Sequence, residues 1–144
     1  MNHTINFKHG RQAEEFALLR HKNPALYAMV VASADFAWRE FRQWTTITSI
    51  YRPGVDSVHA WWRGVDVRIY HPSRWPDDPV AKLRREDEEG WSEEAAYEIA
   101  EWLDRWIWYD DALPEDEGHE VIVVHGVGME RHAHLQLGPW SVDT

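Results

Sequence analysis

The apolar pattern of the chain changes from a helical to an extended period in its first third, and this change limits the fold more than any other feature. Asn23 and Pro24 are a typical helix start, an N-cap followed by a first-turn proline. Apolar residues then recur at helical spacing, which predicts a helix over residues 24–43. The next segment, TTITSIY at 45–51, is rich in β-branched residues and predicts a strand. A domain with both kinds of element is therefore expected.

Four further elements follow along the chain. VDVRIY at 65–70 predicts a second strand, and Ser92 is a suitable N-cap for a helix whose apolar residues form one stripe. EVIVVH at 120–125 and HAHLQL at 132–137 predict two strands joined by a Gly-containing turn. This order of elements, with a hairpin at the end, favours an α+β domain in which helices cover an antiparallel sheet.

The size of the chain predicts a single domain. It has 144 residues and no Cys, and a chain of this size can bury about 70% of its unfolded surface without disulfides or a structural metal. We expect residues 23–144 to form the domain, with an N-terminal arm or short helix at 1–22. A bound metal would then have a catalytic rather than a structural role, and its ligands would be His, Asp or Glu.

Charge and hydropathy argue against several classes of partner. The formal net charge is -10, which disfavours nucleic acid because phosphates repel an acidic surface. The acidic excess is uneven, since residues 77–120 contain 17 acidic and 4 basic side chains. No apolar run approaches the roughly 20 residues that cross a bilayer, and the N-terminal sequence lacks the apolar centre of a secretory signal. We therefore expect no nucleic-acid partner, no membrane partner and no signal peptide. The simplest expectation for the oligomeric state is a monomer.

His59 and Asp66 form the first of two groups of potential ligands among the nine His residues and the acidic side chains. His59 precedes Asp66 by seven positions, too many for neighbouring turns of one helix. The two side chains can meet only where the chain bends between them. Gly64 permits such a bend or a close backbone approach.

The second group is the His-x-His sequence of the last predicted strand. Alternate residues of a strand share a face, so His132, His134 and Gln136 are expected to point one way, and the apolar residues between them to the core. Two His and one Asp suit zinc with one coordination position open to water. Each group alone is weak evidence, because such pairs are more often solvated or hydrogen-bonded. The same donors also form the facial triad of non-haem iron oxygenases.

The segment TSIYRPGVDSVHAWWRGVDVRI resembles the central motif of the zinc D-alanyl-D-alanine peptidases. Relatives of these enzymes include murein endopeptidases, phage endolysin peptidases and hedgehog signalling domains. The family pattern is Ser-x-His-x-x-Gly-x-Ala-x-Asp. Ser57, His59 and Asp66 occupy this pattern in register, with Gly64 at the small-residue position.

Two more elements carry the resemblance. An upstream Ser-x-Tyr-Arg sequence is present as Ser49, Tyr51 and Arg52. The late His-x-His strand is similar to the third-ligand motif of the murein endopeptidases. Together the matches cover about a third of the chain, roughly residues 45–70 and 120–140.

The resemblance implies a peptidase of the hedgehog/DD-peptidase-like fold that cleaves peptide bonds of peptidoglycan stem peptides or cross-links. It implies that His59, Asp66 and His134 hold Zn2+, which polarises the scissile carbonyl and activates a water molecule. The proton of this water would pass to a base, either His132 or Glu130. No nucleotide or organic cofactor is implied.

Substrate contacts are expected from four residues. The resemblance implies that Arg52 binds a substrate carboxylate or the developing oxyanion, and that Ser57 lies behind the ligands or contacts substrate. Trp61 and Trp140 flank the proposed ligands in sequence, so they are candidates to wall a cleft that grips a peptide or sugar.

The chain departs from the family pattern at two positions. The first Gly of the pattern is Trp62 here, which would reshape the turn after His59. Many members place a Glu three residues before the final His as general base, but this position is Arg131, and Glu130 lies one residue further back. The base stays open between Glu130 and His132, because a base is judged first by its distance to the attacking water.

The main alternative is a non-catalytic binding module or virion structural module that keeps the fold and the metal. The missing Glu at the usual base position favours it, as does an acidic surface that anionic cell walls would repel. For the enzyme, the missing signal predicts a cytoplasmic protein that another factor releases to the cell wall. A phage-encoded enzyme would instead be a virion component.

Overall fold

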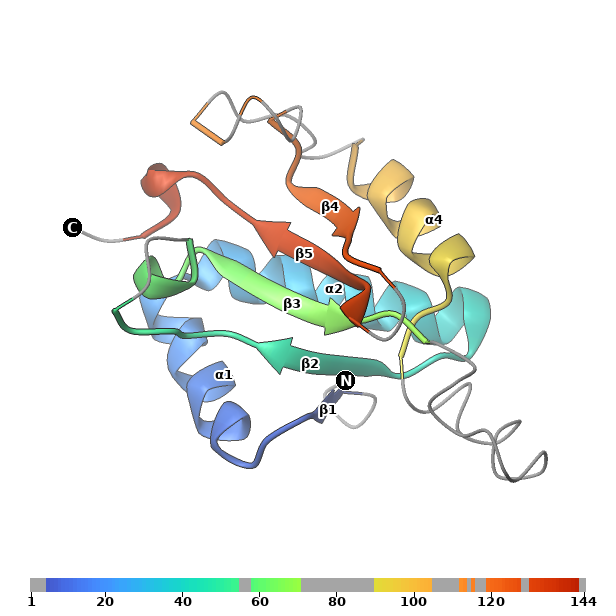
Figure 1. Cartoon of the computed structure of the whole chain (residues 1–144), viewed down its shortest axis with the longest axis horizontal. Helices are drawn as coiled ribbons and strands as arrows, with labels where there is room; N and C mark the ends of the chain where they lie inside the picture. Colours follow the sequence, from blue (N-terminus) through green and yellow to red (C-terminus); the bar gives the residue numbers. More distant parts are fainter. Residues whose placement is uncertain are drawn as a thin grey trace.

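The structure, a computed structural model, describes residues 5–54, 58–70, 90–104, 112, 113, 115, 119–127 and 130–142. These residues form an α+β domain with a five-stranded sheet of order β1-β2-β3-β5-β4 (Figure 1). The strands are β1 (Ile5–Phe7), β2 (Thr45–Ser49), β3 (Gly64–Arg68), β4 (Ile122–His125) and β5 (His132–Gln136). The helices are α1 (Arg11–Lys22), α2 (Pro24–Phe41) and α4 (Glu93–Asp104), with short 3-10 turns η2 (Val58–Trp61) and η6 (Pro139–Ser141).

Helix α2 begins where the sequence predicts. The side-chain oxygen of Asn23 accepts a hydrogen bond from the main-chain N–H of Leu26 at 3.0 Å, and Pro24 occupies the first turn. The helix ends at Phe41, and Arg42 follows in the left-handed conformation with a φ of 54°. The predicted helix and the predicted strand after it are both confirmed, and each is two residues shorter at its end than expected.

The later elements also follow the predicted order. The hydroxyl of Ser92 accepts a hydrogen bond from the N–H of Ala95 at 3.1 Å, as expected of an N-cap. Strands β4 and β5 pair antiparallel, which confirms the predicted hairpin at the end of the chain. No helix in the described part of the chain combines the length and the apolar character needed to span a bilayer.

The sheet is mixed, and the prediction of a wholly antiparallel sheet is wrong at one edge. Strands β2, β3, β5 and β4 are antiparallel neighbours, but β1 runs parallel to β2. The connection from β1 to β2 passes through α1 and α2, and a helical crossover returns the chain to the same end of the sheet. The segment 1–22, expected to be an arm or a short helix, thus contains β1 and α1.

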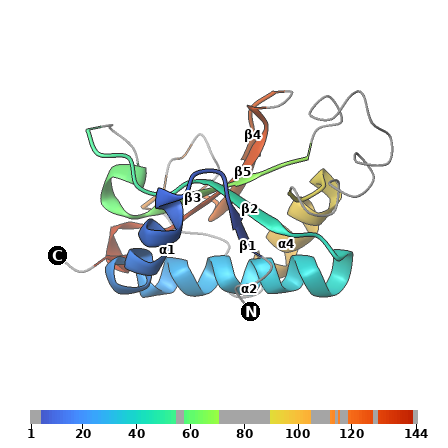
Figure 2. The same ribbon diagram turned by 90° about the horizontal axis from the view of Figure 1, so that it is seen from below.

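The two faces of the sheet have different roles. Figure 2 shows α2 along one face, with α4 on the same side. Val67, Ala133 and Leu135 belong to the buried core on that side and have no exposed surface. Their neighbours Asp66 and His134 point to the opposite face, because successive side chains of a strand alternate. The candidate site lies on this second face.

Candidate metal centre

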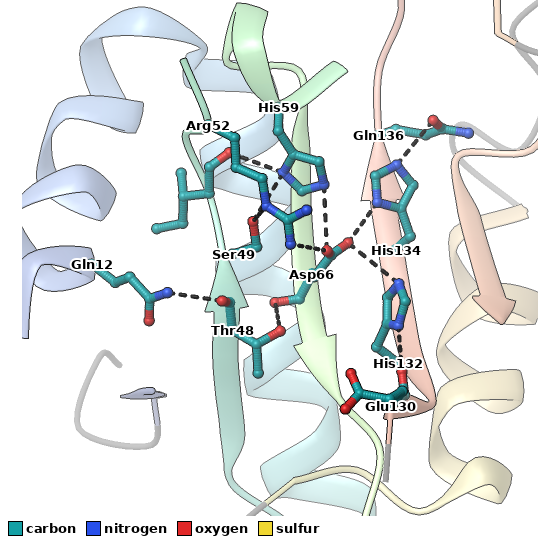
Figure 3. Close-up of polar contacts among 11 residues, drawn as sticks. Gln12, Thr48, Ser49, Arg52, His59, Asp66, Glu130, His132, His134 and Gln136 are labelled. Carbon is teal, nitrogen blue, oxygen red and sulfur yellow. Dashed lines mark hydrogen bonds and ion pairs between the residues drawn. The ribbon is translucent and has the colours of Figure 1, made fainter. Parts of the chain in front are cut away.

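Three side chains from separate elements meet on the face of the sheet opposite the helices. His59 comes from η2, Asp66 from β3 and His134 from β5, and one ligand atom of each lies within 4.8 Å of the others (Figure 3). All three are buried, with exposed fractions of 5%, 6% and 7%. The structure therefore brings together the three predicted ligands as a group that can hold a metal ion.

The chain reverses between His59 and Asp66 at Trp62 rather than at Gly64. Trp62 has a φ of 59°, in the left-handed region that glycine favours, whereas Gly64 is the first residue of β3. The ring of Trp62 stacks on Tyr51 with a centroid distance of 4.5 Å and an interplanar angle of 9°. Trp62 thus has a backbone conformation that glycine adopts more easily, at the position where the resembled motif has its first Gly. Its ring stacks on Tyr51 in this conformation.

The imidazole of His59 is oriented by the main chain of the preceding segment. Its Nδ1 atom lies 3.0 Å from the carbonyl oxygen of Ile50, which can only accept a hydrogen bond. Nδ1 is therefore assigned the proton, and Nε2 presents its lone pair 3.4 Å from Oδ2 of Asp66. A carbonyl on the outer nitrogen is a common way to fix a metal-binding imidazole.

His134 is oriented by the side chain of Gln136. The amide nitrogen of Gln136 donates to the carbonyl of Glu120 at 3.1 Å, so its amide oxygen faces Nε2 of His134, also at 3.1 Å. Nε2 is therefore assigned a proton, and Nδ1 faces Oδ1 of Asp66 at 2.6 Å. A contact this short needs a proton between the two atoms, and a bound cation would take that proton's place.

Asp66 is the anionic centre of the group. Burial raises the pKa of its carboxyl, but the hydrogen bond from His134, together with the adjacent imidazole of His59, outweighs burial and holds the pKa well below its ordinary range. One terminal nitrogen of Arg52 lies 3.7 Å from Oδ2 of Asp66. The carboxylate is thus ionised, as a metal ligand must be.

The donor set fits a divalent transition-metal ion. It consists of two imidazole nitrogens and one carboxylate oxygen, a combination that zinc accepts in catalytic sites and that iron also accepts. The chemistry of the donors therefore supports a metal centre without selecting one metal.

An open cleft of about 380 Å³ reaches Asp66 from the solvent. Among its lining residues are Arg52, Glu130 and His132, three of the residues predicted to act on the substrate. The main-chain N–H of Arg52 also donates to the carbonyl of His59 at 3.3 Å, which joins the cleft wall to the ligand segment.

His132 and Glu130 differ in how they are held. Nδ1 of His132 lies 2.8 Å from the main-chain carbonyl of Glu130 and is therefore assigned its proton. Nε2 of His132 then presents a lone pair 3.9 Å from Oδ1 of Asp66. Glu130 is exposed and holds His132 through its carbonyl rather than its carboxylate.

Comparison with known proteins provides no relative. No family model matches the chain. No curated protein and no solved structure matches it either. What the site can do has to be inferred from its own residues.

The other residues predicted to contact substrate either do not line the cleft or lie outside the described part of the chain. Trp61 and Trp140 are 64% and 58% exposed and do not belong to the described lining. Ser57 lies outside the described residues. Arg131, at the position where many members of the resembled family carry a Glu, donates a hydrogen bond from Nε to Glu93 at 2.7 Å and therefore has a structural contact there.

Sequence reasoning missed the role of Gln136. The alternation of the strand put this residue on the face of His132 and His134, but nothing in the sequence showed that it would orient an imidazole. That role depends on the carbonyl of Glu120, which reaches Gln136 only because the chain before β4 lies beside the end of β5.

Proposed function

We propose that the protein is a zinc-dependent peptidase of the hedgehog/DD-peptidase-like fold that hydrolyses peptide bonds of peptidoglycan stem peptides or cross-links. The observation that carries the proposal is the meeting of His59, Asp66 and His134 beside an open cleft. These are the three residues that the peptidase-like motifs single out as ligands.

The arrangement has the character of a catalytic rather than a structural zinc site. Structural zinc sites use four protein ligands, whereas catalytic sites use three and leave one position open. Nε2 of His59, Nδ1 of His134 and the carboxylate of Asp66 would be the three ligands. Zinc bound there would act as a Lewis acid and lower the pKa of a bound water toward neutrality.

His132 is the better candidate for the general base. Its Nε2 lone pair faces the cleft next to Asp66, and its Nδ1 proton is held by the Glu130 carbonyl. It can accept a proton from the attacking water and later give it to the leaving amine. The nearby Asp66 carboxylate would stabilise the imidazolium between these two steps.

Arg52 would stabilise negative charge on the substrate. Its Nε atom donates to the hydroxyl of Ser49 at 2.8 Å, which holds the guanidinium near the ligands. The side chain is 55% exposed and lines the cleft, so its other N–H groups can reach a bound peptide. A guanidinium in this position suits the oxyanion that develops on the scissile carbonyl.

A non-catalytic metal-containing binding or virion module is the second candidate. The observation that favours it is the ion pair of Arg131 with Glu93, because Arg131 stands where many members of the resembled peptidase family carry the base. If the protein is an enzyme, we expect it to reach the cell wall by release from the cytoplasm or as part of a virion.

Metal content and hydrolysis measured on the same preparations test the proposal. We expect the purified protein to hold about one zinc per chain and to release new amino groups from purified peptidoglycan. His134→Ala should lose both, and His21→Ala, which removes an exposed imidazole of α1, should lose neither. Zinc and hydrolysis retained in His134→Ala would make the ligand assignment wrong. A zinc-loaded wild type without hydrolysis would favour the non-catalytic module.

A further inference from the structure

The described lining of the cleft beside the candidate metal centre carries the opposite charge to the chain as a whole. The chain has a formal net charge of -10. The described lining of the cleft nevertheless contains four cationic side chains and only two acidic ones. The cations are Lys8, Arg52, Arg68 and Arg131, and the acids are Asp66 and Glu130. A divalent ion on the ligands would add further positive charge.

The cations come from separate parts of the fold. Lys8 follows β1, and its main-chain N–H donates to the carbonyl of Ile47 at 2.9 Å, which extends the pairing of β1 with β2. Arg68 follows Asp66 by two positions on β3, so both side chains share one face of the sheet, about 7 Å apart along the strand. The Cα partner of Arg68 on β5 is His132. The pairing of β1, β2, β3 and β5 thus gathers these charges on one surface.

The four cations differ in where they stand around the cleft. Arg131 is held by Glu93, by the hydroxyl of Tyr97 and by the carbonyl of Gly126, so it contributes structure to the wall. Arg52 lies at the Asp66 carboxylate, next to the proposed reacting bond. Lys8 is exposed. Arg68 lies on β3 two positions after Asp66, away from the proposed reacting bond.

Because of these positions, we expect Lys8 and Arg68 to contact a different part of the bound substrate from the part that Arg52 contacts. Arg and Lys form charge-assisted hydrogen bonds with carboxylates, which are stronger than bonds between neutral groups. A cleft lined by one sign of charge also concentrates ligands of the opposite sign. A neutral peptide would gain little from these two side chains, whereas an acidic peptide would gain from both.

We propose that Lys8 and Arg68 form a carboxylate subsite, which binds an acidic group of the substrate outside the bond cleaved at the metal. The assignment to a peptide rests on the proposed peptidase function. The net charge of the whole chain favours a single carboxylate over a polyanion, because a nucleic acid would extend beyond the cleft onto an acidic surface.

Binding of matched peptides to the zinc-loaded protein tests this subsite without depending on hydrolysis. The probes are blocked peptides that differ only in carrying Glu or Gln, placed in turn at each position. A His132→Gln background prevents turnover during calorimetric titration. We expect the Glu peptide to bind about tenfold more tightly than the Gln peptide at one position.

Charge-matched variants locate the effect. In the same background, Lys8→Gln and Arg68→Gln should each reduce the Glu preference severalfold. Lys22→Gln, which removes an exposed lysine outside the cleft lining, should leave the preference unchanged. Zinc content measured for every variant shows whether the fold and the ligands are intact, and the exposed position of Lys8 makes its variant the decisive one.

Three outcomes would overturn the subsite. The first is equal affinity for Glu and Gln peptides at every position. The second is an equal loss of preference in Lys22→Gln and Lys8→Gln. The third is preferential binding of a single-stranded oligonucleotide. Glu preference without hydrolysis in the wild type would reject the peptidase and keep the subsite, whereas hydrolysis without Glu preference would reject only the subsite.

Discussion

The Nδ1 atom of His134 lies 2.6 Å from Oδ1 of Asp66, although 68 positions separate the two residues in the chain. They meet because they are Cα partners in the antiparallel register of β3 and β5. A slip of this register by one residue would turn one of the two side chains toward the helices. The candidate metal centre therefore depends on strand pairing as much as on the identity of its three side chains.

Gln136→Leu should weaken zinc binding while leaving all three ligands in place. The substitution keeps a side chain of similar size but removes the amide oxygen that faces Nε2 of His134. Loss of such an outer partner typically costs about 10- to 100-fold in metal affinity. Competition with a zinc-binding dye measures the change. The control is Gln12→Leu, which removes another buried amide, one that donates to Thr48 and that we expect to affect stability alone. Unchanged zinc affinity in a folded Gln136→Leu protein would contradict the role given to Gln136.

Removal of the metal should lower the melting temperature. Zinc at about 100 times its Kd stabilises a folded protein by roughly 2.7 kcal/mol, which corresponds to a shift of roughly 5–10 °C for a domain of this size. Thermal unfolding with and without a chelator measures the shift. His59→Ala should melt at the same temperature in both conditions. A chelator effect that persists in this variant would point to a metal held elsewhere.

Trp62→Gly should be more stable than Trp62→Ala. Both substitutions remove the stacking on Tyr51, but only alanine is strained by a φ of 59°. The difference between the two variants in free energy of unfolding should be about 1 kcal/mol in favour of glycine, and urea denaturation can measure it. Both variants should be less stable than the wild type because they lose a half-buried aromatic ring. An alanine variant as stable as the glycine variant would show that the turn relaxes.

The metal-free protein should gain stability from Asp66 in a defined pH range. Because the folded-state pKa of Asp66 lies below its ordinary value of 3.8, the ionised carboxylate stabilises the folded state. This contribution is complete above about pH 5 and declines as the pH falls toward the folded-state pKa. Unfolding of the wild type and of Asp66→Asn in chelator should therefore differ by more at about pH 5 than at about pH 3. A difference that grows in acid would contradict the sign of the shift.

Local signals in the sequence were enough to predict most elements. Asn23 and Ser92 act as N-caps through their own side chains, so these helix starts follow from neighbouring residues. The alternation of HAHLQL placed His132 and His134 on one face because a strand has a fixed period of two. The three candidate ligands were named through the resemblance to a peptidase motif, and the structure brings them together as a group able to hold a metal ion.

The side-chain partners of these residues and the edge of the sheet depend on contacts between residues far apart in the chain. The donors of the Asn23 amide reach the carbonyl of Trp62 and the hydroxyl of Ser141, and no local pattern reveals such partners. The parallel edge strand β1 is three residues long, too short for its period to identify it.

The sequence by itself singled out the side chains that could bind a metal and placed two of them, Asp66 and His134, on strands. The tertiary structure alone decided that His59 is held by the Ile50 carbonyl and that Gln136 orients His134. It also decided that, among the described residues, an acidic chain lines its cleft with more basic than acidic side chains. The physical reason is that period and capping act over a few residues along the chain. Tautomers, ligand geometry and local charge depend on atoms that become neighbours only when the strands pair.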